Sequence, residues 1–287
     1  MTIEPLNRRP WIKRALLLML ALPLAAFGST EARSAPKADL WPLWEAHDPE
    51  STRALDHARW TDFLQRHVHG DESGVNRVAY ARIPEQDRRD LSDYLKALAA
   101  MAVSTLNRAE QMAYWINLYN ALTVKVILDH YPVESIRDID ISPGFFADGP
   151  WDKTLVTIEG VPISLNDIEH RILRPIWRDP RLHYALNCAS LGCPNLQRNA
   201  FSAMNAPSLL DKAARDFINS PRGARIEDDQ LTVSSIYIWF TEDFEGDTDG
   251  VIRHLKKFAA PDLAATLDDV TEIDDAYDWS LNDAATK

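Results

Sequence analysis

The stretch NRAEQMAYWINLYNALTVKVILDHYP, residues 107–132, decides the fold more than any other part of the sequence. Asn107 and Glu110 have the spacing of a capping box, and Pro132 cannot continue a helix, so the stretch carries a start and a stop signal. Between these ends, apolar side chains recur three and four residues apart, which is the helical period, at Met112, Trp115, Leu118, Leu122 and Val126. The sequence therefore predicts one long helix here.

The neighbouring sequence predicts further helices and short hairpins. Helical patterns cover residues 60–69, 87–103, 164–177, 206–221 and 251–258. Alternating apolar and polar residues predict hairpins about residues 159–160 and 228–229 and a strand over residues 181–190. Because these elements do not alternate strictly as strand, helix and strand, we expect a single helix-rich α+β domain with short antiparallel β-hairpins.

Composition places the chain among acidic globular proteins. Hydrophobic residues make up 46% of its 287 residues and charged residues 26%, so we expect a packed core. The formal net charge is -12, and no block rich in Lys and Arg occurs after residue 35. Nucleic acid and anionic membrane surfaces are therefore disfavoured as partners, since binding to either needs clustered basic groups.

The first 34 residues have the three parts of an export signal. Arg8, Arg9, Lys13 and Arg14 precede an apolar run over residues 15–27, and small residues follow. The Arg8–Arg9 pair resembles a twin-arginine motif, while an ordinary secretory signal and an uncleaved anchor remain open. We expect a periplasmic or secreted protein with no stable membrane span after signal cleavage, because no second apolar run of about 18 residues exists.

The expected domain order follows from these patterns. After the signal peptide, residues 35–59 carry tryptophans in a polar setting and indicate a peripheral N-terminal segment. We expect residues 60–260 to form the globular domain and residues 261–287 to form an acidic C-terminal tail. The sequence leaves the oligomeric state open.

Both cysteines lie in HYALNCASLGC, residues 183–193. Four interpretations are open: a reactive thiol, a Cys188–Cys193 disulfide, a metal site completed by His170 or His183, and a core strand that ends in a turn. We expect no metal, because no second pair of ligands has a metal-binding spacing. In a strand, alternation turns His183 and Cys188 to opposite faces, which leaves His170 as the better partner for a thiolate.

Other polar and aromatic side chains are candidates for the same site. Asn117 and Asn120 share a face of the long helix, where they either bind substrate and orient an imidazole or satisfy backbone groups of a loop. Trp151 lies in the Gly/Pro-rich loop 142–153, where it forms a binding lip or plugs the core. Signatures of serine hydrolases, nucleotide-binding proteins and zinc proteases are absent, and we expect no cofactor.

Four separated motifs follow one another in the order YWINLYNALTVKVIL (114–128), GPWDKTLVTIEGVPISLNDIEHRILRP (149–175), DPRLHYALNCASLGCPNL (179–196) and LTVSSIYIWFTEDF (231–244). Together they resemble the Domain-of-Unknown-Function 547 family, over roughly residues 60–255. The resemblance implies one globular domain and brings no established activity. It also implies recurring residues, which match Trp115, Asn117, Asn120, Trp151, His170, Asn187, Cys188 and Trp239 of this chain.

These observations favour an exported cysteine-dependent hydrolase or acyl transferase that acts on an amide or peptide. Cys188 is the expected nucleophile and His170 its base. The other candidates would orient or bind the substrate, namely Asn117, Asn120, Asn187, Trp115, Trp151 and His183. The alternative is a non-catalytic domain of the cell envelope that binds a peptide, a glycan or another small molecule. A Cys188 sulfur within about 4 Å of a His170 ring nitrogen would favour the enzyme.

Overall fold

The computed structural model describes Met1 and residues 35–144, 149–227, 230–270 and 272–284. The chain divides into two units, Met1–Ser34 and Ala35–Lys287, and the fold given below belongs to the second. The expected export signal after Met1 and the loop residues Phe145 and Phe146 lie outside the described residues. Within the described ranges, no helix is both long enough and apolar enough to cross a membrane.

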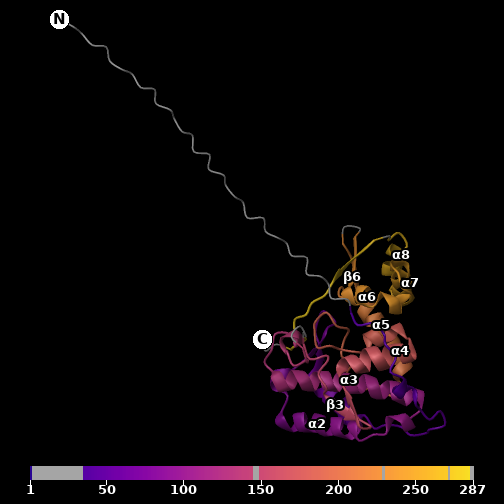
Figure 1. Ribbon diagram of the computed structural model, residues 1–287. Coiled ribbons are helices and arrows are strands. Elements are labelled where there is room, and N and C mark those ends of the chain that lie inside the picture. Colours follow the sequence, from indigo (N-terminus) through magenta and orange to yellow (C-terminus); the bar gives the residue numbers. More distant parts are fainter. Residues whose placement is uncertain (2–34, 145–148, 228–229, 271, 285–287) are drawn as a thin grey trace. The chain divides into compact units, whose positions relative to one another are not determined.

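Helices dominate the second unit (Figure 1). The α-helices are α1 (Ala58–His67), α2 (Glu85–Ala99), α3 (Arg108–His130), α4 (Arg174–Trp177), α5 (Ala206–Ile218), α6 (Ser235–Trp239), α7 (Thr248–Phe258) and α8 (Pro261–Thr266). Single turns of 3-10 helix are η1 (Pro42–Glu45), η2 (Tyr80–Arg82), η3 (Val103–Thr105), η4 (Ile136–Asp138), η6 (Pro180–Tyr184) and η7 (Thr241–Phe244), and η5 (Asp167–Leu173) is a π-helix. The predicted α+β class is confirmed.

Helix α3 is the centre of the fold. Every side chain from Ala113 to Val124 is buried, so this helix is covered on all sides and not along one face. The predicted start is confirmed, because the Asn107 side chain accepts the N–H of Glu110 at 3.0 Å. The Glu110 carboxylate accepts the N–H of Leu55 at 3.3 Å and so joins the helix start to the N-terminal segment.

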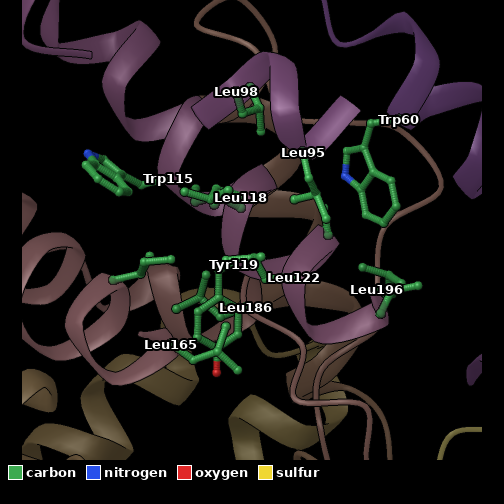
Figure 2. Packing of buried hydrophobic residues seen from close by; sticks show 14 of the residues in the cluster. Trp60, Leu95, Leu98, Trp115, Leu118, Tyr119, Leu122, Leu165, Leu186 and Leu196 are labelled. Atoms are coloured by element: carbon green, nitrogen blue, oxygen red, sulfur yellow. The ribbon is translucent and has the colours of Figure 1, made fainter. Parts of the chain in front are cut away.

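The main hydrophobic core surrounds α3, and α2 runs alongside it (Figure 1). Figure 2 shows Leu118 of α3 between Leu98 of α2 on one side and Leu165 and Leu186 on the other. Trp44 of the N-terminal segment belongs to this core, with its ring centroid 5.0 Å from that of Trp115. A second cluster forms between α5, β6, α6, η7 and α7 from Phe217, Val233, Tyr237, Phe244 and Leu255.

The strands form small sheets. They are β1 (Val68–Gly70), β2 (Asn76–Val78), β3 (Val156–Ile158), β4 (Val161–Ile163), β5 (Ala224–Glu227), β6 (Gln230–Ser234) and β7 (Ile273–Ala276). The strands pair antiparallel as β1–β2, β3–β4 and β5–β6, which confirms both predicted hairpins, although the tip at residues 228–229 lies outside the described residues. Glu159 and Gly160 both have positive φ, at 48° and 82°, as the tight β3–β4 turn requires.

The strand predicted over residues 181–190 is wrong. Asp179 caps the 3-10 helix η6 through the N–H of Arg181 at 2.9 Å, and the residues after η6 form turns. Ser190 makes only an isolated bridge, to Leu281. The apolar run in this segment reflects burial in an irregular loop, which a two-residue period cannot distinguish from a strand.

Two other elements differ from their expected form. The helix predicted from residue 164 forms, with the Ser164 hydroxyl accepting the N–H of Asp167 at 3.1 Å, but its middle is the π-helix η5. The second strand of the hairpin about residues 228–229 ends at Ser234, because the Ser234 side chain caps α6 at the N–H of Ile236.

The C-terminal segment is acidic as expected, and it is folded. β7 adds to β6 as a parallel strand. Residues 277–284, here called the C-terminal strap, then run along the cysteine segment: the N–H of Leu191 donates to Ser280 and the N–H of Gly192 donates to Asp278, both at 2.8 Å. A Cβ on Gly192 would lie 2.8 Å from the Asp278 nitrogen, so only glycine allows this close approach.

Candidate functional site

The side chain of Asn187 closes the cysteine loop, residues 187–194. Its amide oxygen accepts the N–H of Ala189 at 3.0 Å, and its amide nitrogen donates to the Pro194 carbonyl at 2.8 Å. Ala189 has a φ of 64°, in the left-handed region, which turns the chain back on itself. The two cysteines therefore lie close together.

Both sulfurs share one hydroxyl group. Tyr277 of the strap places its hydroxyl oxygen 3.1 Å from Cys188 Sγ and 3.2 Å from Cys193 Sγ. Ser190 Oγ lies 3.2 Å from Cys188 Sγ and 2.8 Å from the Tyr277 hydroxyl. The backbone N–H of Cys188 donates to Cys193 Sγ at 3.0 Å. Both cysteines are free thiols, so the disulfide interpretation is not realised in this structure.

The surroundings favour a thiolate on Cys193. Burial opposes its ionisation, but hydrogen bonds from the Cys188 thiol, the Tyr277 hydroxyl and the Cys188 N–H outweigh burial and lower the pKa of Cys193 to about 7. The pKa of Cys188 is raised, because its thiol hydrogen-bonds to Cys193 and because its partial burial disfavours the charged form. Arg222 adds positive charge nearby and donates to the Cys193 carbonyl at 2.7 Å. The pair therefore loses its first proton near neutral pH.

Access to this pair is unequal. Cys188 is half-buried, whereas Cys193 is only 4% exposed.

Beside the thiols lies a group of half-buried rings, here called the aromatic platform, made of Trp151, Trp239, Tyr277 and Trp279. Trp239 stacks on Trp279 with centroids 5.6 Å apart, and Tyr277 lies 4.8 Å from Trp239. Trp151 meets Trp279 edge-on at 5.9 Å.

His170 takes other partners than the expected Cys188. Its Nδ1 accepts from the Arg174 guanidinium at 3.0 Å, and its ring stacks on Phe240 with centroids 5.8 Å apart. Burial lowers the pKa of His170 to about 4. Among the described residues no hydrogen bond or ring contact joins His170 to Cys188, so the structure does not bring the expected base to the nucleophile.

His183 also belongs to a different cluster. Its Nε2 donates to Asp243 Oδ2 at 2.7 Å, and the same oxygen accepts from Arg174 Nε at 2.6 Å. The His183 ring stacks on Phe240 at 4.4 Å. His170, Arg174, Asp243 and His183 thus form one buried polar network that ties the 165–177 helix to η7.

The two asparagines of α3 hold backbone. Asn117 accepts the N–H of Phe201 at 2.9 Å and donates to the Phe201 carbonyl at 2.7 Å. Asn120 accepts the N–H of Asn187 at 2.9 Å and donates to the Ala185 carbonyl at 2.8 Å. Both are buried, so they satisfy loop backbone groups, which is the second of the two interpretations of their pattern. Asn120 positions the cysteine loop.

Replacing Asn120 by alanine should lower the free energy of unfolding by about 2 kcal/mol, because it leaves the Asn187 N–H and the Ala185 carbonyl buried without partners. Denaturant unfolding of the reduced protein measures this loss. Asn199→Ala is the control, since Asn199 is exposed and its side chain accepts a hydrogen bond from the exposed side chain of Gln65 at 2.9 Å. Equal stability of the Asn120→Ala variant and the wild type would contradict the positioning role.

Trp115 was expected to bind substrate, but it is a core residue that is 1% exposed.

Several other residues of this site were not predicted from the sequence. Tyr277, Trp279, Ser190 and Arg222 were not expected. Two aromatic residues within an acidic segment were the available signal, because a solvated tail has no reason to carry them. Within the described ranges, no three residues of the His, Cys, Asp and Glu types are arranged to hold a metal ion.

Fold and site together define an α+β domain with two neighbouring thiols beside an aromatic platform. Residues 103–218 match the family described as "Protein of unknown function, DUF547", which confirms the predicted resemblance over that region. The matched region contains α3 and the whole cysteine loop and ends before β5 and the strap. Comparison with curated proteins and with solved structures found no match.

Proposed function

We propose that this protein is a cysteine-dependent hydrolase or acyl transferase acting on an amide or peptide, with Cys188 as the nucleophile. The observation that carries the proposal is the pairing of the two thiols under the Tyr277 hydroxyl. Cys193 takes the role expected for His170. The more accessible sulfur attacks and the buried sulfur holds the proton.

The chemistry balances within the pair. Cys193 as thiolate accepts the proton of the Cys188 thiol, and the Cys188 sulfur adds to the carbonyl carbon of the substrate. Ser190 and Tyr277 carry hydroxyl groups next to that sulfur and can donate to the oxygen that becomes negative. The amine leaves with the proton held on Cys193, and water or a second amine then takes the acyl group from the Cys188 thioester.

The proposed setting is periplasmic or extracellular. Its support is the basic and apolar pattern of residues 1–34, which is typical of an export signal. Such a setting would give the enzyme peptides or amide-linked polymers outside the cytoplasm as substrates.

Acylation by p-nitrophenyl acetate tests the mechanism. We expect reduced wild-type protein to carry an acetyl thioester on Cys188, mapped by mass spectrometry, with a rate that rises through pH of about 7. The Cys193→Ser variant keeps the nucleophile but loses the proton acceptor. Its rate at neutral pH should fall about tenfold, and its profile should move up to the range of an ordinary thiol at about 8.5.

Cys188→Ser is the matched control and should form no thioester. Identical rates and pH profiles for wild type and Cys193→Ser would overturn the role of the pair. Acetyl groups found only on residues other than Cys188 would overturn the enzyme as a whole.

A non-catalytic binding function is the second candidate, and the aromatic platform favours it. Half-buried tryptophan rings offer flat apolar faces to a peptide or a glycan. This alternative requires a saturable change of tryptophan fluorescence with a peptide or glycan, lost in Trp279→Ala and unchanged in Cys188→Ser. If this result is obtained and no acyl thioester forms, the binding function is supported and the enzymatic function is refuted.

A further inference from the structure

We infer that Cys188 and Cys193 are a site of reversible oxidation, at which exchange with a low-molecular-weight disulfide produces an intramolecular disulfide. The oxidised pair has no free thiol, so oxidation would also silence the acyl chemistry. That regulatory consequence rests on the proposed function, whereas the oxidation itself does not.

The first support is the fixed approach of the two sulfurs. Distant cysteines are bridged only when the backbone moves, so a facile disulfide needs sulfurs that already lie side by side. Here the Tyr277 hydroxyl contacts both sulfurs, at 3.1 and 3.2 Å, and the N–H of Cys188 reaches Cys193 Sγ at 3.0 Å. The Asn187 side chain holds the loop closed on both sides of the pair.

The second support is the division of roles by exposure. The half-buried Cys188 can meet a disulfide from solution, whereas Cys193, at 4% exposed, can meet only its neighbour. The charged and titratable groups near the pair include Arg222 and the tyrosines Tyr80, Tyr119 and Tyr277. The guanidinium of Arg222 favours a thiolate in this loop. An accessible thiol next to a second, resolving thiol is the arrangement typical of cysteines that undergo reversible oxidation.

The exchange proceeds in two balanced steps. The Cys193 thiolate first takes the proton of the Cys188 thiol. The Cys188 sulfur then attacks one sulfur of oxidised glutathione, forms a mixed disulfide and releases one glutathione thiolate, which takes that proton from Cys193. The Cys193 thiolate then attacks Cys188 Sγ, forms the internal disulfide and releases the second glutathione. Two protein thiols are oxidised and one glutathione disulfide is reduced to two thiols.

Equilibration of the full chain in glutathione buffers of graded redox ratio tests the inference. After acid trapping, mass spectrometry should show the wild type passing directly from dithiol to a mapped Cys188–Cys193 disulfide. Cys193→Ser should accumulate a mixed disulfide of Cys188 with glutathione, because it lacks the resolving thiol. Cys188→Ser should remain largely unmodified, because the remaining sulfur is buried.

Accumulation of glutathione on wild-type Cys188 without an internal disulfide would overturn the inference, as would a pair that stays reduced in oxidised glutathione. Neither readout depends on acylation. Internal disulfide formation without any acetyl thioester in the reduced protein would refute the proposed function and leave the oxidation site intact. A thioester in reduced protein that is lost on oxidation and restored by dithiothreitol would support both.

Discussion

Replacing Trp115 by alanine is expected to lower the free energy of unfolding by about 3–5 kcal/mol. Trp115 is 1% exposed in the first half of α3, and its indole meets the rings of Trp44 and Tyr114 edge-on, each with centroids 5.0 Å apart. Truncation removes this contact area and leaves a cavity that the long helix, packed on all sides, cannot collapse to fill. Denaturant unfolding of reduced wild type and variant measures the loss.

Trp177→Ala is the matched control. Trp177 is half-buried at the edge of the core, with the Arg108 guanidinium 5.5 Å from its ring centroid, so its truncation should cost only about 1 kcal/mol. A Trp115→Ala variant with full stability but no acylation would contradict the core assignment and return Trp115 to the substrate site.

Local patterns in the sequence predicted the helices well. The start of α3 depends on Asn107 and its packing on apolar residues three and four apart, and both signals lie within one continuous stretch. The β3–β4 hairpin likewise depends on two adjacent residues at its turn, Glu159 and Gly160. Such elements need no knowledge of distant parts of the chain.

The segment 181–190 has an apolar pattern that its backbone does not follow as a strand. Its apolar residues are buried, but its backbone groups bond a side chain and the strap in place of a neighbouring strand, as in the bond from Asn282 to the Ala189 carbonyl at 2.9 Å. Asn187 supplies a side-chain bond that competes with regular structure. A segment whose backbone hydrogen bonds are made in this way has the composition of a core strand but not its extended geometry.

The candidate site likewise has a part that the sequence predicted and a part that only the fold brings together. The sequence identified Cys188 and the loop that carries it, because both cysteines lie within six residues of one another. Its partner could not be identified, since Tyr277 stands 89 residues away from Cys188 and reaches it only through the fold. The helical period predicted which face of its helix His170 occupies, but it could not predict what packs against that face. In the structure His170 contacts Arg174 and Phe240.

Replacing Asp243 by alanine is expected to cost about 3–5 kcal/mol of stability, the second large effect. Asp243 accepts from Arg174 at 2.6 Å and from His183 at 2.7 Å, and the Arg174 side chain is only 3% exposed. Without the carboxylate, the guanidinium stays buried with neutral partners alone, namely the Pro36 carbonyl and His170 Nδ1. Thermal or denaturant unfolding at neutral pH measures the loss.

Asp93→Ala controls for the loss of a carboxylate. Asp93 pairs with Lys96 at 2.9 Å, but their side chains are 53% and 77% exposed, so this change should cost well under about 1 kcal/mol. Equal losses of unfolding free energy in Asp93→Ala and Asp243→Ala would contradict a stabilising role of the buried network. A loss of acylation at unchanged stability in Asp243→Ala would instead place the network in the catalytic site.

The acid dependence of stability provides a further test of Asp243. Burial opposes its ionisation, but hydrogen bonds from His183 and Arg174 outweigh burial and lower the pKa of Asp243 to about 2, from an ordinary value of 3.8. The unfolded chain therefore binds this proton first as the pH falls, and the stabilisation is complete above pH of about 4 and lost toward pH 2. The stability difference between wild type and Asp243→Ala should accordingly be constant at neutral pH and shrink below pH of about 4. A difference that grows on acidification would require the carboxyl group to be held protonated in the folded protein, and Arg174 would then have to be neutralised by another group.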